Sequence, residues 1–157
     1  MLQRVCEHIH NYFIREDESV VHPGTFEITG GTLSIDFLKE GQRFWICGSD
    51  LNDGVYTWHA TGIKNDDDNA AVVLKDETFG GTISAMSVKP DFLALVAEIS
   101  AWMTKYGDAM NSPYQSENVI GVYSYNKGNG QSGNGAGSDW QTVFRSRLSP
   151  YKRVSLL

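Results

Sequence analysis

Residues 24–88 contain six short runs of β-branched and aromatic residues, separated by segments rich in Gly and Asp. The runs are TFEITGG, TLSIDFL, RFWICGS, VYTWHA, AVVL and TISAMSV. Runs of this length bounded by turn residues are typical of short antiparallel strands. We therefore expect a small antiparallel sheet or half-barrel. Between two of the runs, Asp53-Gly54 predicts a tight hairpin turn, because Gly supplies the positive φ that such a turn requires.

Helical periodicity appears on both sides of this region. In residues 1–14, apolar residues at three- and four-residue spacing predict an amphipathic helix; they are Leu2, Val5, Cys6, Ile9 and Phe13. Pro90 and Asp91 begin a second predicted helix, which Gly107 ends. Its apolar stripe consists of Phe92, Leu95, Val96, Ile99, Trp102, Met103 and Tyr106.

Residues 112–157 hold an extended run, ENVIGVYSYNK, then a Gly-rich segment and a last predicted helix. Ser138 or Asp139 is expected to cap this helix, and Pro150 to end it. Its apolar positions fall on one continuous face: Trp140, Val143, Phe144, Leu148 and Tyr151. A chain of 157 residues is most simply one domain. We expect the α+β class, with an N-terminal helix, the sheet, a long helix and a C-terminal helix on a Gly-rich tether.

The Gly-rich segment contains Gly128, Gly130 and Gly133 in the order G-x-G-x-x-G of dinucleotide-binding loops. Such a site needs glycines that join a buried strand directly to a helix within a βαβ unit. Here Asn, Gln and Ser dilute the glycines, a composition typical of flexible linkers. The segment is therefore predicted to be a tether, and we expect no nucleotide cofactor.

Three clusters of potential metal ligands each lack part of the required pattern. NDDDNA (65–70) has neither the central Gly nor the closing Glu of a helix-loop-helix calcium site, and DLNDG (50–54) has no Glu at the twelfth position. Of Cys6, His8 and His10, only the first and last share a helix face. We therefore expect two solvated turns, an ordinary helix and no metal site.

Nothing in the sequence indicates an enzyme or a secreted protein. His22 and His59 lie in the predicted strands, but no nucleophile motif accompanies them. Cys6 and Cys47 lie far apart in apolar surroundings and do not suggest a disulfide framework. We see neither a signal sequence nor an apolar run of the roughly 18 residues that suggest a membrane span. We expect synthesis in the cytoplasm and no membrane partner.

Charge is distributed unevenly along the chain, whose net charge is -6. Residues 139–157 hold one acidic and four basic residues, which leaves a net charge of -9 on the first 138 residues. An acidic body speaks against free nucleic acid as the main partner, because nucleic-acid binding needs a concentrated basic face. A basic tail and an acidic body favour head-to-tail contact between copies of the chain.

The C-terminal third, SENVIGVYSYNK followed by a linker and WQTVFRSRLSPYKRV, resembles the end of the head–tail connector (adaptor) proteins of tailed phages. That family tends to carry Ser-Glu, then Gly, then Tyr-Ser-Tyr, and a final helix that closes on Leu-x-Pro-Tyr-Arg/Lys. Further blocks resemble the version in prophages of Gram-positive bacteria: HNYF (10–13), FWICGSDLNDGVYTW (44–58), LKDETFGGTISAMSV (74–88) and SPYQSEN (112–118). The resemblance covers most of the chain and departs at Asn118-Val119-Ile120 and in the acidic loop 66–68.

The resemblance implies a structural protein of the virion neck. Such adaptors form a twelve-fold ring beneath the portal protein and present a surface to a stopper or tail-completion protein, while DNA passes through the channel without sequence-specific binding. Two alternatives stay open at this point. One is a tail-completion or minor tail protein, and the other is a small β-rich ligand-binding module suggested by Trp45, Tyr56 and Trp58. Strand alternation predicts that Tyr56 and Trp58 share one face and enter the core.

Candidate partner-binding residues lie in the last helix and the extended run. An aromatic and apolar set is predicted to anchor the last helix against this or a neighbouring subunit: Trp140, Phe144, Leu148 and Tyr151. A basic set is predicted to pair with carboxylates of the portal or the next subunit: Arg145, Arg147, Lys152 and Arg153. Packing within the chain and a solvated basic face are the alternative. Tyr123 and Tyr125 would mark a strand-addition surface over residues 119–126, and Asp66, Asp67 and Asp68 would line the channel or lie outside it.

Overall fold

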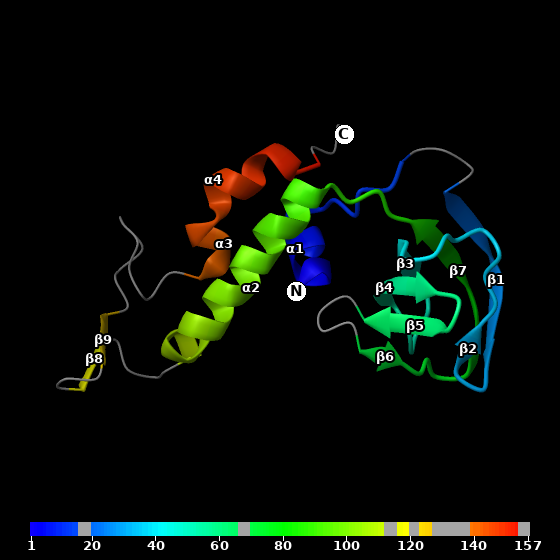
Figure 1. The fold of residues 1–157 in the computed structure, drawn as a ribbon, viewed down its shortest axis with the longest axis horizontal. Coiled ribbons are helices and arrows are strands. Elements are labelled where there is room, and N and C mark those ends of the chain that lie inside the picture. The colour runs from blue at the N-terminus through cyan, green and yellow to red at the C-terminus, as the bar shows by residue number, and fades with distance from the viewer. Residues whose placement is uncertain (16–19, 66–69, 112–115, 120–122, 127–138, 154–157) are drawn as a thin grey trace. The chain divides into compact units, whose positions relative to one another are not determined.

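The computed structural model describes residues 1–15, 20–65, 70–111, 116–119, 123–126 and 139–153, with the backbone alone described at 108–111, 116–119 and 123–126. The chain divides into two compact units, Met1–Leu93 and Ala94–Leu157. Helices and a curled antiparallel sheet confirm the predicted α+β class (Figure 1).

The first unit consists of a short helix, α1 (Leu2–Ile9), and a seven-stranded antiparallel sheet. The strands are β1 (Val21–Thr29), β2 (Thr32–Leu33), β3 (Arg43–Cys47), β4 (Gly54–His59), β5 (Gly62–Asn65), β6 (Ala71–Val72) and β7 (Glu77–Ala85). Their order in the sheet is β2-β1-β7-β3-β4-β5-β6. The sheet region was therefore predicted correctly, although β5 was missed and TLSIDFL forms a strand only at its first two residues.

The core of this unit lies against one face of the sheet. Those members that lie in strands alternate along them, as expected for a sheet with one buried face. They are Ile28, Leu33, Ile35, Leu38, Phe44, Ile46, Ile63, Leu74, Phe79, Ile83 and Ala85. Tyr56 and Trp58 pack against this cluster, which confirms the alternation argument, whereas Trp45 stacks on Tyr12 with ring centroids 4.1 Å apart. These three aromatic residues therefore do not form one exposed platform.

The β3–β4 connection differs from the predicted tight turn at Asp53-Gly54. Gly54 is already the first residue of β4, pairs with Ile46 and does not have a positive φ. The positive φ of the connection belongs to Gly48, at 93°. The prediction was wrong because the connection is a six-residue loop, 48–53, which turns at its beginning instead of its end.

The predicted helix over residues 1–14 was too long. Its apolar residues up to Ile9 are buried as expected, but His10 has φ 53° and ends α1. The Asn11 side chain then accepts a hydrogen bond from the Phe13 N–H at 2.8 Å, so a local bond competes with continuation of the helix. Phe13 consequently leaves the helix and contacts Phe92, with ring centroids 4.5 Å apart.

The second unit contains most of α2 (Pro90–Asn111) and the elements that follow it. They are β8 (Ser116–Val119), β9 (Tyr123–Asn126), α3 (Trp140–Val143), α4 (Arg145–Leu148) and a 3-10 turn, η1 (Ser149–Tyr151). Residues 92, 95, 96 and 99 of α2 are buried as predicted, but Gly107 does not end the helix. A single Gly costs a helix only about 1 kcal/mol, which is too little to stop it.

Within the predicted extended run at 117–127, the structure has β9 and most of β8, which pair with each other in antiparallel fashion. The prediction of one last helix needs correction. The last helix is interrupted at Phe144, where φ is -97° and ψ is 6°. Pro150 lies inside η1, because a Pro in the first turn of a helix removes no hydrogen bond that the turn needs. The Gly-rich segment 128–133, Ser138 and Asp66, Asp67 and Asp68 lie outside the described residues.

Candidate partner-binding surface

The C-terminal segment 139–153 begins at a well-defined helix cap. The Asp139 carboxylate accepts a hydrogen bond from the Thr142 N–H at 2.7 Å, as an N-cap residue should. The backbone bonds from Phe144 N–H to Trp140 C=O and from Leu148 N–H to Phe144 C=O, both 2.9 Å, carry the helical repeat across the interruption. The segment therefore keeps one apolar face along its length.

That apolar face is buried within the chain. Trp140, Phe144 and Leu148 have exposed fractions of 4%, 8% and 0%, while Tyr151 is half-buried. Phe144 meets the ring of Trp102 on α2 edge-on, with centroids 6.3 Å apart. The structure thus places the three most apolar candidate residues in intrachain packing, which leaves the polar face of the segment for other contacts.

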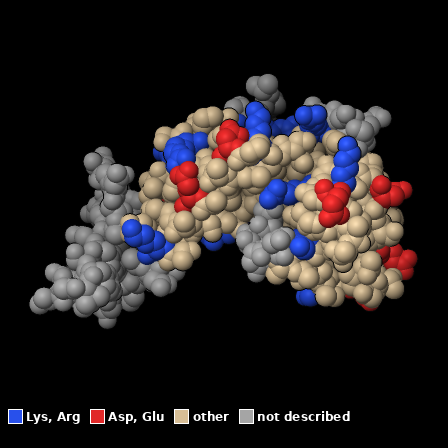
Figure 2. Space-filling view, in the orientation of Figure 1, with Lys and Arg blue, Asp and Glu red and all other residues tan. Residues whose placement is uncertain are grey.

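The polar face of the segment carries the four basic candidates, and all four are exposed. Arg147 forms a two-point ion pair with Glu98 of α2, at 2.5 Å and 3.0 Å, and also lies over the Phe144 ring. Hydrogen bonds from this guanidinium hold the pKa of Glu98 below its ordinary range. Arg147 is therefore used within the chain. We define the basic face as the exposed residues Arg145, Lys152 and Arg153. Figure 2 shows blue side chains over the C-terminal helices.

Tyr123 and Tyr125 both lie on β9, which confirms that they occupy a strand. Tyr123 pairs with Val119 and Tyr125 with Glu117 in the hairpin register. The sequence did not reveal the hairpin because its two strands are four residues each and look like a single run of strand-forming residues. The predicted strand-addition segment is therefore a two-stranded element.

The sequence also missed a polar network under the loop 48–53. Asn52 is 4% exposed, and its amide exchanges hydrogen bonds with the backbone of Lys75, accepting from the N–H at 2.7 Å and donating to the C=O at 2.9 Å. Asn52 also donates to Glu77 at 2.5 Å, and the Ser49 hydroxyl donates to the same carboxylate. These bonds tie the loop to the start of β7 and leave Leu51 half-exposed at its tip.

The partners of Glu77 set its ionisation. The Ser49 hydroxyl contributes most, followed by the Asn52 amide and the N–H groups of Leu51 and Asp50, and together these donors hold the Glu77 pKa below its ordinary range. The network links two sequence blocks, 44–58 and 74–88, through residues that lie 23 and 25 positions apart in the chain. Because no local pattern relates Asn52 to Glu77, only the folded sheet reveals the pair.

The Glu77 network predicts a pH-dependent stability. A carboxylate with a lowered pKa in the folded state stabilises the fold above its ordinary pKa of about 4.3, and this contribution is lost as the pH falls through the lowered value. The free energy of unfolding, measured in urea, should therefore fall more steeply below about pH 5 for the natural chain than for Glu77→Gln. Glu27→Gln, on an exposed residue of the same sheet, is the control and should keep the natural pH profile. Identical profiles for the natural chain and Glu77→Gln would contradict this role.

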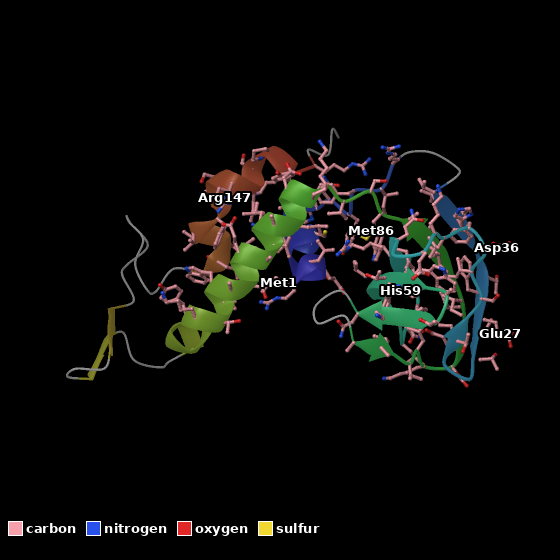
Figure 3. All side chains as sticks on the ribbon, viewed as in Figure 1. Met1, Glu27, Asp36, His59, Met86 and Arg147 are labelled. Carbon is pink, nitrogen blue, oxygen red and sulfur yellow. The ribbon has the colours of Figure 1, made fainter. Side chains whose placement is uncertain are left out.

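The two histidines of the sheet region have distinct surroundings. His59, labelled in Figure 3, contacts the Glu40 carboxylate through Nδ1 at 2.6 Å, and the Ala60 N–H donates to the same carboxylate at 2.8 Å. His22 instead stacks on Phe37, with ring centroids 3.5 Å apart. The Ala60 N–H and the His59 side chain hold the pKa of Glu40 below its ordinary range. The contacts of Glu40 with His59 and Ala60 therefore link the connection before β3 to the β4–β5 turn.

Comparison of the chain with protein-family models, curated proteins and solved structures finds no match. In the part of the chain that the structure describes, no group of three or more His, Cys, Asp or Glu side chains is placed to hold a metal ion. None of the described helices is long and apolar enough to cross a membrane.

Proposed function

We propose that this chain is a head–tail connector of the phage neck, a structural protein that assembles as a ring beneath the portal and joins the DNA-filled head to the tail. The order of its sequence blocks, which resembles that of adaptor proteins, supports this assignment. The observation that carries it is a pair of complementary charged surfaces on one chain. A closed ring of identical subunits needs two different patches that fit each other, because each copy contacts its two neighbours through different surfaces.

One patch is the basic face of Arg145, Lys152 and Arg153. Four acidic and six basic residues in the second unit make it weakly basic, whereas the first unit has fifteen acidic and seven basic residues. The buried side chains beneath the basic face, Trp140, Phe144 and Leu148, fix its position relative to α2. The face is therefore a fixed surface able to meet carboxylates of another chain.

The other patch lies on the first unit, at the edge of the sheet formed by β1 and β2. We call it the acidic rim, and it consists of the exposed residues Glu27, Asp36 and Asp76. Asp76 is held in place because its carboxylate accepts a hydrogen bond from Gly31 in the β1–β2 turn, at 2.7 Å. Figures 2 and 3 show acidic side chains at this edge, with Glu27 and Asp36 labelled in Figure 3. We assign the contact between copies to the basic face and the acidic rim.

Charge reversal on the basic face tests this proposal. The double variant Arg145→Glu with Lys152→Glu should weaken assembly on the portal ring by roughly tenfold or more at low salt, because repulsion replaces attraction. The matched control is Lys39→Glu with Lys89→Glu, which makes the same change of charge at exposed residues of the first unit. Assembly is measured by sedimentation with purified portal rings, after thermal melting shows that both variants fold. An equal loss of assembly in both double variants would contradict the assignment, because the change in net charge alone would then explain the loss.

A further inference from the structure

The outer edge of β1 is open along most of its length. On one side β1 pairs with β7 over eight residues, from Val21 to Ile28. On the other side it pairs with β2 only at Ile28 and Thr29. Residues 21–27 therefore have a strand partner on one side alone. Open strand edges invite pairing with another chain, and proteins normally cover or block them.

The direction of the backbone groups on this edge follows from one hydrogen bond. Ala85 N–H donates to Val20 C=O at 2.8 Å, in register with the β1–β7 ladder. Because alternate residues of an antiparallel pair exchange hydrogen bonds, the even-numbered residues of β1 bond to β7. The backbone polar groups of the odd-numbered residues point outward: the N–H and C=O of Val21, Thr25 and Glu27, and the C=O of Pro23. Apart from the ladder with β2, which begins at Ile28, none of the outward groups of Val21, Pro23 and Thr25 makes a backbone hydrogen bond with another described residue.

The middle of the edge is accessible. Pro23, Gly24 and Thr25 are exposed, and the exposure of Gly24 is exposure of backbone because Gly has no side chain. Pro23 carries no N–H, so Thr25 and Glu27 are the two successive outward positions that offer both a donor and an acceptor. An antiparallel strand of four residues has two positions that exchange hydrogen bonds with such a pair. The free stretch of β1 therefore fits one short strand.

The same chain has such a strand. β8 and β9 are four residues each, and in the described chain they pair only with each other. A two-stranded hairpin is marginally stable alone in water, so it gains stability by joining a larger sheet. β9 (Tyr-Ser-Tyr-Asn) carries no charge, whereas β8 carries Glu117. Since the β1 edge bears Glu27 and Asp36, β9 is the strand that joins it without bringing like charges together.

We infer that β9 of one copy adds to the open edge of β1 in a second copy, with Thr25 and Glu27 as the hydrogen-bonding positions of the acceptor. The inference deepens the proposed function by naming a mode of contact between neighbours in the ring. It gives each copy a donor strand and a different acceptor edge, as a head-to-tail interface requires. Tyr123 and Tyr125 would then belong to the strand that is donated.

Amide hydrogen exchange tests the inference on the natural chain. In the dilute monomer, the Thr25 and Glu27 amides should exchange fast, while those of Gly24 and Phe26, which bond to β7, exchange slowly and serve as internal controls. In the assembled protein the Thr25 and Glu27 amides should become at least tenfold slower. An assembly in which they still exchange at the monomer rate would overturn the inference. Protection already present in the dilute monomer would also overturn it, because the edge would then be covered within one chain.

A substitution at the edge provides a second test. Thr25→Pro removes the outward N–H without removing a bond to β7, and should weaken association of copies by roughly tenfold or more. Thr25→Ala keeps the N–H and should associate like the natural chain. Light scattering over a concentration series measures association, and thermal melting shows whether each variant folds. If Thr25→Pro folds and associates like Thr25→Ala, the inference is wrong; if it does not fold, the exchange experiment decides.

The two proposals fail in different ways. Assembly on the portal without protection of the β1 edge would overturn the strand addition and leave the connector role standing. Self-assembly with a protected edge but no binding to the portal would overturn the connector role and leave the strand addition standing. A chain that stays monomeric at high concentration, both alone and with the portal, would overturn both.

Discussion

Replacing Phe144 with Ala should lower the free energy of unfolding of the second unit by about 3–5 kcal/mol, the usual cost of deleting a buried aromatic side chain. Phe144 is 8% exposed, touches Trp102 edge-on and lies between the buried residues Trp140 and Leu148 in the helical repeat. The deletion removes this contact and leaves a cavity under the basic face. We therefore expect Phe144→Ala to impair assembly indirectly, by loosening the segment that carries the face.

Urea unfolding monitored by circular dichroism measures this loss in the isolated chain. Arg145→Ala, at the next residue and fully on the exposed face, is the control and should change stability by less than about 0.5 kcal/mol. If Phe144→Ala kept the natural stability but lost assembly, Phe144 would be an interface residue and its burial within the chain would not be its role.

Replacing Gly81 with Ala should destabilise the sheet by about 1–3 kcal/mol or more, because the added methyl group has no space. A Cβ at Gly81 would lie 2.3 Å from the carbonyl oxygen of Cys47 and 3.0 Å from the ring of Phe79. The first of these atoms belongs to the backbone of β3, the strand next to β7, and cannot rotate away. Relieving this clash would therefore require β3 and β7 to move apart, at the place where β7 joins the two halves of the sheet.

The neighbouring residue supplies a matched control for this prediction. Gly80 has no atom within 4 Å of an added Cβ and no positive φ, so Gly80→Ala should be close to neutral. Thermal melting of the two variants side by side gives the comparison. Equal melting temperatures for Gly80→Ala and Gly81→Ala would contradict the close approach of β3 and β7.

Local patterns predicted the elements that local forces determine. The apolar spacing in α2, the Asp139 cap and the alternation that buries Tyr56 and Trp58 are all present in the fold. β5 was missed because Gly-Ile-Lys-Asn has one apolar residue and forms a strand only by pairing with β4. The turn at residue 53 was misplaced because Asp-Gly favours a tight hairpin, whereas the bonds of Asn52 to Lys75 and Glu77 hold a longer loop.

The candidate surfaces were predictable to different degrees. The basic residues of the C-terminal segment were visible as a charge imbalance, but the pairing of Arg147 with Glu98 joins residues 49 positions apart and required the fold. The open edge of β1 depends on how short β2 is, and TLSIDFL reads as a longer strand than the two residues that pair. The acceptor side of the proposed ring contact was therefore invisible in the sequence, whereas the extended conformation of Tyr123 and Tyr125 was predicted.

The most direct test of the connector assignment is the mass of the particle that the natural chain forms with the portal ring of the same genome. Size-exclusion chromatography with light scattering measures it, first for each protein alone and then for the mixture. We expect one co-eluting particle whose mass exceeds that of the portal ring by about twelve copies of the chain, the symmetry expected of an adaptor ring. Separate elution of the portal and an unbound chain would contradict it, and would direct the search to a tail-tube protein as partner.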